Sequence, residues 1–165
     1  MATHRIPILG HGTVPDSSGD VFFEPWSVKA TGAPAIDPLV LIFNDSGAKD
    51  GVRGSFRVPE NYVGSAKLLI VWTSSATAGT CVFDWSVLPR SGAEDMGAAA
   101  ARTTETVNVT KGGTADFREE SSMALTDGDY AAGDEVLFEL FRDTITDTMA
   151  AAAVVFGVYF EYADA

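Results

Sequence analysis

Cysteine, histidine and positive charge are all scarce in this chain. Of its 165 residues, one is cysteine and two are histidine. Because a single cysteine, Cys81, cannot form an intramolecular disulfide, the class of secreted domains built on disulfide frameworks is excluded. Lys and Arg number 11 against 23 Asp and Glu, so the formal net charge is −12. Since nucleic acid binding depends on clustered Lys and Arg, we expect no nucleic acid partner.

Long apolar segments are missing as well. No window of the sequence approaches the ~20 apolar residues that a helix needs to cross a bilayer. The first ten residues also lack the apolar segment that is typical of a signal peptide. We therefore expect cytoplasmic synthesis and no membrane partner.

Sequence motifs that mark enzyme active sites are absent too. The chain contains no Gly-x-Ser-x-Gly elbow, no His-Glu-x-x-His pair, no phosphate-binding glycine loop and no dinucleotide fingerprint. Its two histidines, His4 and His11, lie in the N-terminal segment. A carboxylate pair such as Asp84 and Glu139 has the chemistry of a glycosidase, but 23 acidic side chains make such a pair expected by chance. We predict no catalytic residue, no cofactor and no enzymatic activity.

Strand patterns and turn residues are abundant. The chain has 16 Gly and 7 Pro, and 46% of its residues are hydrophobic. Roughly ten short runs with the two-residue period of a β-strand are separated by turn signals, a spacing typical of a β-sandwich or barrel. The runs cover residues 5–9, 21–29, 39–44, 54–58, 66–74, 81–88, 104–110, 118–125, 135–142 and 154–162.

These patterns predict an all-β fold, a jelly-roll-like antiparallel β-sandwich in a single domain. The length is sufficient for one domain with its own core. We assign residues 20–165 to the sandwich and residues 1–19 to an N-terminal arm or a first strand. The Ala-rich segment Gly92–Arg102 departs from the strand pattern and is expected to form a short helix or an ordered excursion.

Alternation within the runs predicts which side chains form the core. In a strand, every second side chain points to the same face. Cys81 lies on such an apolar face, so we expect a buried thiol and not a nucleophile. The predicted core residues are Leu68, Ile70 and Trp72, then Cys81, Phe83, Trp85 and Val87, then Val136, Phe138 and Leu140, and finally Val154, Phe156, Val158, Phe160 and Tyr162.

The C-terminal part of the chain contains three polar dipeptides around its last two strands. Gly133 and Asp134 open the first strand, Arg142 and Asp143 close it, and Asp147 and Thr148 precede the final strand. We interpret these six residues as a structural loop motif in which Arg142 forms a salt bridge with Asp143 or Asp147.

Three acidic residues at a nearby turn are the best metal candidates. They are Asp127, Asp129 and Asp134, with Gly128 allowing a sharp turn between the first two. The spacing is not that of an EF-hand loop. The interpretation that we favour is turn capping, in which the carboxylates accept hydrogen bonds from backbone amides, and we predict no metal site.

The dipeptides that frame the last two strands resemble those of jelly-roll structural proteins of tailed bacteriophages. The segments Arg5-Ile-Pro-Ile-Leu-Gly and Asp20-Val-Phe-Phe-Glu-Pro-Trp are similar to the openings of such proteins. The resemblance implies a virion structural protein, most like a capsid cement or decoration protein that binds and stabilises the assembled shell. It also implies the major capsid protein as partner, a homotrimer, and a place on the outer capsid surface after synthesis in the host cytoplasm.

The N-terminal residues Arg5, Ile6, Pro7, Ile8 and Leu9 are the candidate contact with the capsid or with a neighbouring subunit. They form an apolar patch with one cation, followed by a Gly-rich polar stretch. Such a segment can extend and add a strand to a neighbour's sheet. The alternative is that it is the first strand of its own sandwich, and the sequence leaves both open.

Two other functions fit the same sequence pattern. One is a tail-associated protein that serves in adsorption or in a fibre. The other is a carbohydrate-binding jelly-roll module, because exposed aromatic rings bind sugars and Trp26, Tyr62 and Tyr130 fall near predicted turns. A sugar-binding module would bind a polysaccharide saturably.

Overall fold

The alternating patterns form β-strands throughout the computed structural model, which describes residues 2–9, 13–15, 21–26, 38–47, 49–98 and 100–164. Eleven strands and one short 3-10 helix lie in these residues. They are β1 (Thr3–Pro7), β2 (Val14–Pro15), β3 (Val21–Pro25), β4 (Leu39–Phe43), β5 (Lys49–Arg57), β6 (Tyr62–Thr73), β7 (Thr80–Arg90), β8 (Thr103–Thr110), β9 (Glu119–Ala124), η1 (Asp127–Asp129), β10 (Glu135–Asp143) and β11 (Ala153–Asp164).

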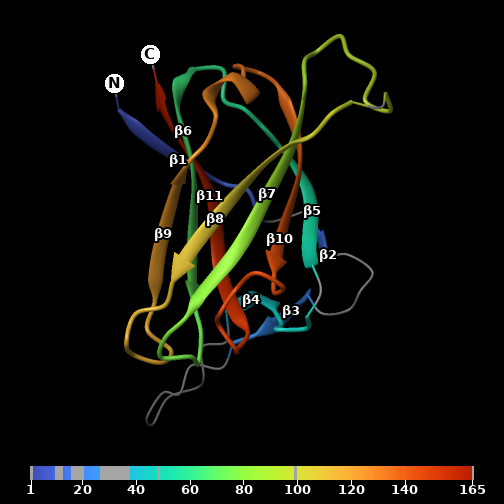
Figure 1. Ribbon diagram of the computed structural model, residues 1–165. Coiled ribbons are helices and arrows are strands. Elements are labelled where there is room, and N and C mark those ends of the chain that lie inside the picture. The colour runs from blue at the N-terminus through green and yellow to red at the C-terminus, as the bar shows by residue number, and fades with distance from the viewer. Residues whose placement is uncertain are drawn as a thin grey trace.

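The strands form two antiparallel sheets that pack face to face. The six-stranded sheet has the order β3-β4-β11-β6-β9, and β1 also pairs with β11. The five-stranded sheet has the order β2-β5-β10-β7-β8. In Figure 1, β7 and β8 pass in front of β6 and β11. This arrangement confirms the predicted all-β, jelly-roll-like antiparallel sandwich in a single domain.

Aromatic side chains fill the space between the sheets. Trp85 stacks on Phe138 with ring centroids 4.9 Å apart, and its indole Nε1 donates a hydrogen bond of 3.0 Å to the Tyr130 hydroxyl. The predicted core residues of β6, β7 and β10 are all in this core. Burial raises the pKa of Cys81 to about 12. The thiol therefore stays protonated at neutral pH, as expected of a buried apolar group.

The core prediction for β11 is wrong at its start. Val154 and Phe156 were expected to point inward with Val158, Phe160 and Tyr162. A register shift between Val155 and Gly157 adds one residue to this strand, and an added residue reverses the alternation. Ala153 and Val155 point into the core before the shift, whereas Phe156 is exposed on the outer face.

The segment Gly92–Arg102 forms exposed turns, and no helix is found in the part of it that the structure describes. It projects beyond the end of the sandwich between β7 and β8 (Figure 1). Short local bonds shape it: the Ser91 amide donates to the Glu94 carboxylate and the Gly97 amide donates to Asp95. A short Ala-rich helix is only marginally stable in water unless one of its faces packs on the rest of the protein. This segment projects beyond the sheets, so a helix here would gain little from packing.

Candidate functional site

The N-terminal candidate residues lie in the molecule's own six-stranded sheet. β1 pairs with β11 from Thr3 opposite Ala163 to Pro7 opposite Tyr159. Arg5 donates to Glu161 at 2.7 Å, which lowers the pKa of that carboxyl, and Ile8 is buried. Ile6 and Leu9 pack against the core. Arg5, Ile6 and Pro7 thus belong to a strand of the sandwich and Ile8 and Leu9 follow it directly, while the contact of these five residues with another subunit stays a prediction.

The predicted loop motif is organised around a buried guanidinium. The Arg142 side chain is 0% exposed, and its Nε donates to Asp147 at 2.7 Å. Three of its other four N–H groups donate to main-chain carbonyl oxygens, those of Phe43, Met149 and Ala151. Of the two predicted salt bridges, the one with Asp147 is formed. Arg142 thus joins β4 to the connection between β10 and β11.

The other members of the motif have separate partners. Asp143 accepts from Lys49 at 2.9 Å, so the alternative pairing of Asp143 with Arg142 is wrong. Thr148 exchanges two hydrogen bonds with Thr80, because its amide donates to the Thr80 carbonyl and its hydroxyl accepts from the Thr80 amide, both at 2.9 Å. Gly133 has a φ of +85°, a conformation that favours glycine, and its amide donates to the Val58 carbonyl.

Two of the three metal candidates, Asp127 and Asp134, cap turns, whereas Asp129 accepts from the Thr103 hydroxyl at 3.2 Å. Asp127 accepts from the Ala66 amide at 2.7 Å and from the Tyr62 hydroxyl at 3.0 Å, which lowers its pKa. Asp134 accepts from the Ala131 amide at 3.2 Å. Within the ranges that the structure describes, no group of three or more His, Cys, Asp or Glu side chains gathers as a metal site. The interpretation as backbone caps is the one that these contacts support.

The aromatic residues expected at a sugar-binding face are mostly unavailable. Tyr62 and Tyr130 are buried, at 9% and 5% exposure, and their hydroxyls bond to Asp127 and Trp85. Trp26 is half-buried and packs edge-on against Phe156 at 6.3 Å between centroids. The position of a residue near a turn therefore did not identify an exposed ring in this protein.

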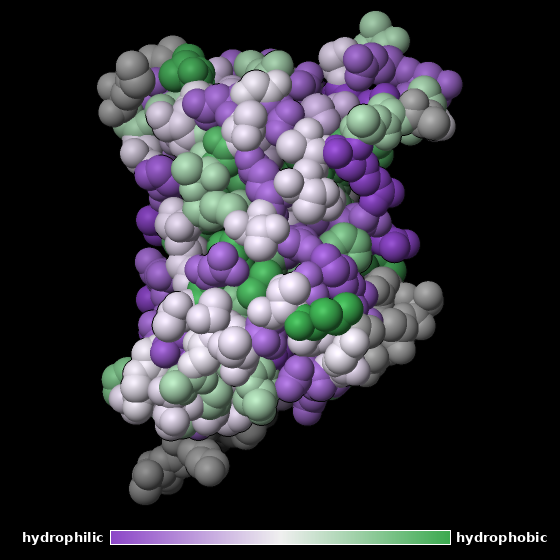
Figure 2. Space-filling view, in the orientation of Figure 1, coloured by the Kyte–Doolittle hydropathy of each residue, from purple (hydrophilic) through white to green (hydrophobic). Residues whose placement is uncertain are grey.

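A different set of polar side chains gathers on the outer face of the five-stranded sheet. Antiparallel pairing aligns outward-facing residues of β5, β10 and β7 in rows across the strands. One row joins Arg53, Glu139 and Ser86, and the next joins Ser55, Leu137 and Leu88. In Figure 2, which views the molecule from the side of β7 and β8, hydrophilic and hydrophobic residues are mixed over this surface.

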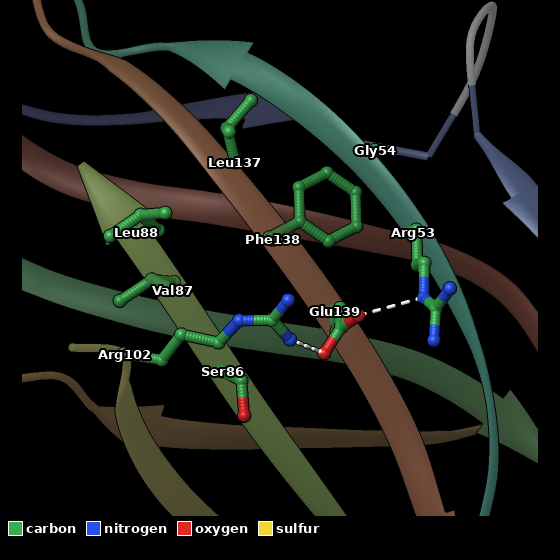
Figure 3. Close-up of a pocket in the computed structure, with 9 residues that line it drawn as sticks. All are labelled: Arg53, Gly54, Ser86, Val87, Leu88, Arg102, Leu137, Phe138 and Glu139. Carbon is green, nitrogen blue, oxygen red and sulfur yellow. Dashed lines mark hydrogen bonds and ion pairs between the residues drawn. The ribbon is translucent and has the colours of Figure 1, made fainter. Parts of the chain in front are cut away.

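A hollow of about 180 Å³ opens in these rows. Figure 3 shows two arginines that converge on one carboxylate from opposite sides. Arg53 Nε donates to Glu139 Oε1 at 2.7 Å, and Arg102 Nη1 donates to Glu139 Oε2. The remaining lining residues are Gly54, Ser86, Val87, Leu88, Leu137 and Phe138.

Exposure distinguishes the three charged groups in the hollow. The Glu139 side chain is 12% exposed, whereas the side chains of Arg53 and Arg102 are 61% and 54% exposed. Each guanidinium carries five N–H donors, and its bond to Glu139 uses one of them. The hollow therefore presents several N–H donors beside the apolar side chains of Leu88 and Leu137, while the Ser86 hydroxyl is bonded to that of Thr104 at 2.7 Å. Such a mixture suits a neutral polar ligand with an apolar face.

The sequence contained only part of the signal for this site. Alternation predicts that Glu139 faces outward, but it does not say which strands lie beside β10. Asp84, the carboxylate paired with Glu139 in the sequence analysis, lies one row away and bonds to Lys49 at 2.7 Å and to Thr106 at 2.8 Å. Both carboxylates are thus held by their own donors and do not form an acid and base pair.

A second hollow lies on the other sheet. It has a volume of about 180 Å³, and all of its lining residues are apolar. They are Leu9, Phe23, Leu39, Leu41, Val155 and Phe156. Without a polar group to orient a ligand, this surface has less of the chemistry of a specific small-molecule site.

Comparisons with known proteins concern the fold. No family model matches the sequence, and no curated protein matches it. Among solved structures, the CBM35 of Cellvibrio japonicus Abf62 is similar at 12% identity and a TM-score of 0.52, with 99% of each chain covered. The CBM35 of Paenibacillus barcinonensis has 12% identity, a TM-score of 0.52 and coverage of 97% of this chain and 98% of its own.

A third structure agrees with these two. The family 35 carbohydrate binding module of Clostridium thermocellum has 12% identity and a TM-score of 0.51, with 98% of this chain and 99% of its own covered. The predicted bacteriophage structural protein is contradicted by these matches, and so is its capsid cement function. The predicted capsid partner, homotrimer and virion location depended on that resemblance, and nothing in the structure tests them.

No helix in the described part of the chain is long and apolar enough to cross a membrane.

The three matched structures are carbohydrate-binding modules and not catalytic domains. At 12% identity the likeness concerns the fold alone. The chain has the two-sheet β-sandwich fold seen in carbohydrate-binding modules of family 35.

Proposed function

We propose that this protein is a carbohydrate-binding module that binds a sugar at the hollow between Arg53, Glu139 and Arg102. The observation that carries the proposal is the convergence of two half-exposed guanidinium groups on one carboxylate beside two leucines, on the outer face of a sandwich of this fold. The full-length likeness to three carbohydrate-binding modules supports it.

The chemistry of the hollow suits a sugar. Sugar hydroxyls both donate and accept hydrogen bonds, and a carboxylate flanked by N–H donors satisfies both needs within a small area. The C–H groups of a sugar ring are apolar and are removed from water when they contact leucine side chains. Arg53 and Arg102 would donate to hydroxyls, Glu139 would accept from one, and Leu88 and Leu137 would contact the ring.

Binding without turnover is part of the proposal. Glu139 is the one carboxylate among the residues that line the hollow, and each of its oxygens accepts from an arginine N–H and keeps a lone pair for a sugar hydroxyl. A hydrolase of the two-carboxylate type needs one carboxyl that gives a proton and another that acts as a base or nucleophile. The arginines would instead hold the Glu139 side chain in position for recognition.

The test is a binding assay with matched arginine variants. Wild type is measured by affinity electrophoresis and calorimetry against xylan, mannan, galactan and β-glucan. We expect saturable binding to at least one of them and a loss of tenfold or more in Arg102→Ala. Arg118→Ala is the control, because Arg118 is 61% exposed, pairs with Glu120 and precedes β9 in the other sheet.

Two outcomes would contradict the proposal. One is that wild type binds none of the four polysaccharides. The other is that Arg53→Ala and Arg102→Ala bind as tightly as Arg118→Ala does, which would place the sugar elsewhere. A released reducing end, measured on the same polysaccharides, would contradict binding without turnover.

A further inference from the structure

A partly exposed aromatic ring lies beside the hollow. Phe141 is on β10, two residues after Glu139, so both side chains stand on the outer face of the five-stranded sheet. Two residues of a strand span about 7 Å, which places the ring next to the hollow and outside its lining. Phe141 lies opposite Gly51 of β5 and Asp84 of β7.

The ring depends on a glycine in the neighbouring strand. A Cβ atom at position 51 would stand 2.4 Å from Phe141 Cδ1 and 3.0 Å from Cγ. The Leu140 carbonyl oxygen would stand 2.5 Å from the same Cβ, so the Phe141 ring and the β10 main chain together occupy the space that a side chain at this position would fill. Gly51 itself is buried, while Phe141 remains partly exposed. Glycine in a strand interior often marks such a close approach, and an aromatic ring from the adjacent strand covers it.

Hydrogen-bonding groups border this ring. Lys49 Nζ donates to Asp84 at 2.7 Å and to Asp143 at 2.9 Å. Thr106 donates to the other oxygen of Asp84 at 2.8 Å. The Lys49 side chain is 50% exposed, so it is open to a ligand above the sheet. The Phe141 ring thus has charged groups and a hydroxyl at its edge. This combination of an apolar surface and hydrogen-bonding groups is also found in the hollow, one row away along the strands.

We propose that Phe141 is the stacking platform for a second sugar unit, so that the ligand is a chain of at least two sugars laid along β10. This inference rests on the proposed function, because the first sugar is the one in the hollow. The apolar face of the second sugar covers the ring, and its hydroxyls lie toward Lys49 and Thr106. Aromatic rings stabilise such contacts through their large apolar surface.

Chain length and the aromatic ring are tested together. The probes are the β-1,4-linked tetrasaccharides of xylose, glucose, mannose and galactose, and the corresponding monosaccharides, measured by calorimetry. We expect the tetrasaccharide of the preferred sugar to bind at least tenfold more tightly than its monosaccharide. Phe141→Leu keeps an apolar side chain without a ring, and it should lose most of that difference while monosaccharide binding is unchanged.

Two further variants refine the test. Gly51→Ala keeps the phenylalanine but must displace its ring together with the Leu140 main chain, and we expect it to weaken tetrasaccharide binding at least as much as Phe141→Leu does. Phe117→Leu is the matched control, since Phe117 is 65% exposed and precedes β9 at the other sheet. Each variant is first compared with wild type by thermal unfolding, and calorimetry is interpreted on folded protein.

The possible results separate this inference from the proposed function. If wild type binds no probe, both are overturned. If Arg102→Ala weakens binding but Phe141→Leu behaves like Phe117→Leu, the hollow binds sugar and the second platform is wrong. Equal affinity of wild type for monosaccharide and tetrasaccharide also overturns the platform.

Discussion

Two pairs of basic side chains are used differently in this protein. Arg142 and Lys111 lie at one end of the sandwich with side chains that are 0% exposed. Arg53 and Arg102 lie on the outer face of the five-stranded sheet with side chains more than half exposed. The first pair is enclosed by acceptors from its own chain, whereas the second pair shares one carboxylate and keeps donors open.

Lys111 illustrates the enclosed kind. Its Nζ donates to the Thr114 carbonyl at 2.7 Å, to the Phe117 carbonyl at 3.3 Å and to Glu119 at 3.0 Å. A buried ammonium has three donors, and each has an acceptor here. Buried charge with every donor satisfied fixes a loop, while exposed charge with free donors is available for a ligand. The burial of a basic side chain therefore distinguishes residues that stabilise the fold, such as Lys111, from residues that can bind a ligand, such as Arg102.

The largest effect is expected from Arg142→Met. The substitution leaves Asp147 and three main-chain carbonyl oxygens without their donor at a buried position. Removing one partner of a buried ion pair costs about 3–5 kcal/mol of the free energy of unfolding. Urea unfolding followed by circular dichroism measures this loss. If Arg142→Met loses no more stability than Arg53→Met, the distinction between the two pairs fails.

A smaller loss is expected from Lys111→Met. Its ionic partner Glu119 is 28% exposed, so water can replace part of the lost bond. The Phe117 carbonyl keeps its bond from the Thr73 hydroxyl at 2.7 Å, so we expect a loss of roughly 1–3 kcal/mol. The same urea titration should place this variant between Arg142→Met and wild type. Glu119→Gln serves as the companion variant, and it should lose less than Lys111→Met because the carbonyl bonds are kept.

Little change in stability is expected from Arg102→Ala. Ion pairs of exposed side chains contribute about 0.2–1 kcal/mol, and Glu139 keeps Arg53 as a partner. The free energy of unfolding should therefore stay within about 1 kcal/mol of wild type, while the proposed sugar binding is lost. A large loss of stability in Arg102→Ala would mean that the ion pairs of the hollow stabilise the fold, as those of Arg142 do.

The smallest effect concerns pH. Hydrogen bonds from the Ala66 amide, the Ser65 amide and the Tyr62 hydroxyl lower the pKa of Asp127 below its usual value of 3.8. A carboxyl with a lowered pKa in the folded state contributes stability above the unfolded pKa and loses it as pH falls through the folded pKa. We expect the urea concentration at half unfolding of wild type to decrease as the pH is lowered below 3.8. The same decrease should be less steep in Asp127→Asn. Parallel profiles would contradict the capping role of Asp127.

Local patterns were sufficient for much of the fold. Cys81, Phe83 and Trp85 alternate along one strand with residues that include Asp84 and Ser86, and that alternation alone places them in the core. Arg142 and Asp147 are five residues apart, so their ion pair depends mainly on one connection between strands. Where one added residue enters a strand, the same reasoning fails, as it does at Phe156 in β11.

The candidate site could not be obtained in the same way. Arg53, Arg102 and Glu139 come from three separate parts of the chain, and only the register of β5 against β10 and the path into β8 bring them together. Nothing in the residues around Phe141 shows that Gly51 lies opposite it. The functional resemblance drawn from terminal dipeptides was wrong because Arg142 and Asp147 serve loop geometry, which many β-sandwiches need.

The sequence by itself determined the secondary structure class, the inward faces of β6, β7 and β10, and the buried state of Cys81, because these depend on the local two-residue period of a strand. The tertiary structure decided the outer face. Strand order and register place Glu139 between Arg53 and Arg102, and Gly51 beneath Phe141. The physical reason is that side-chain periodicity is a property of one strand, whereas a surface site depends on which strands pair and in which register.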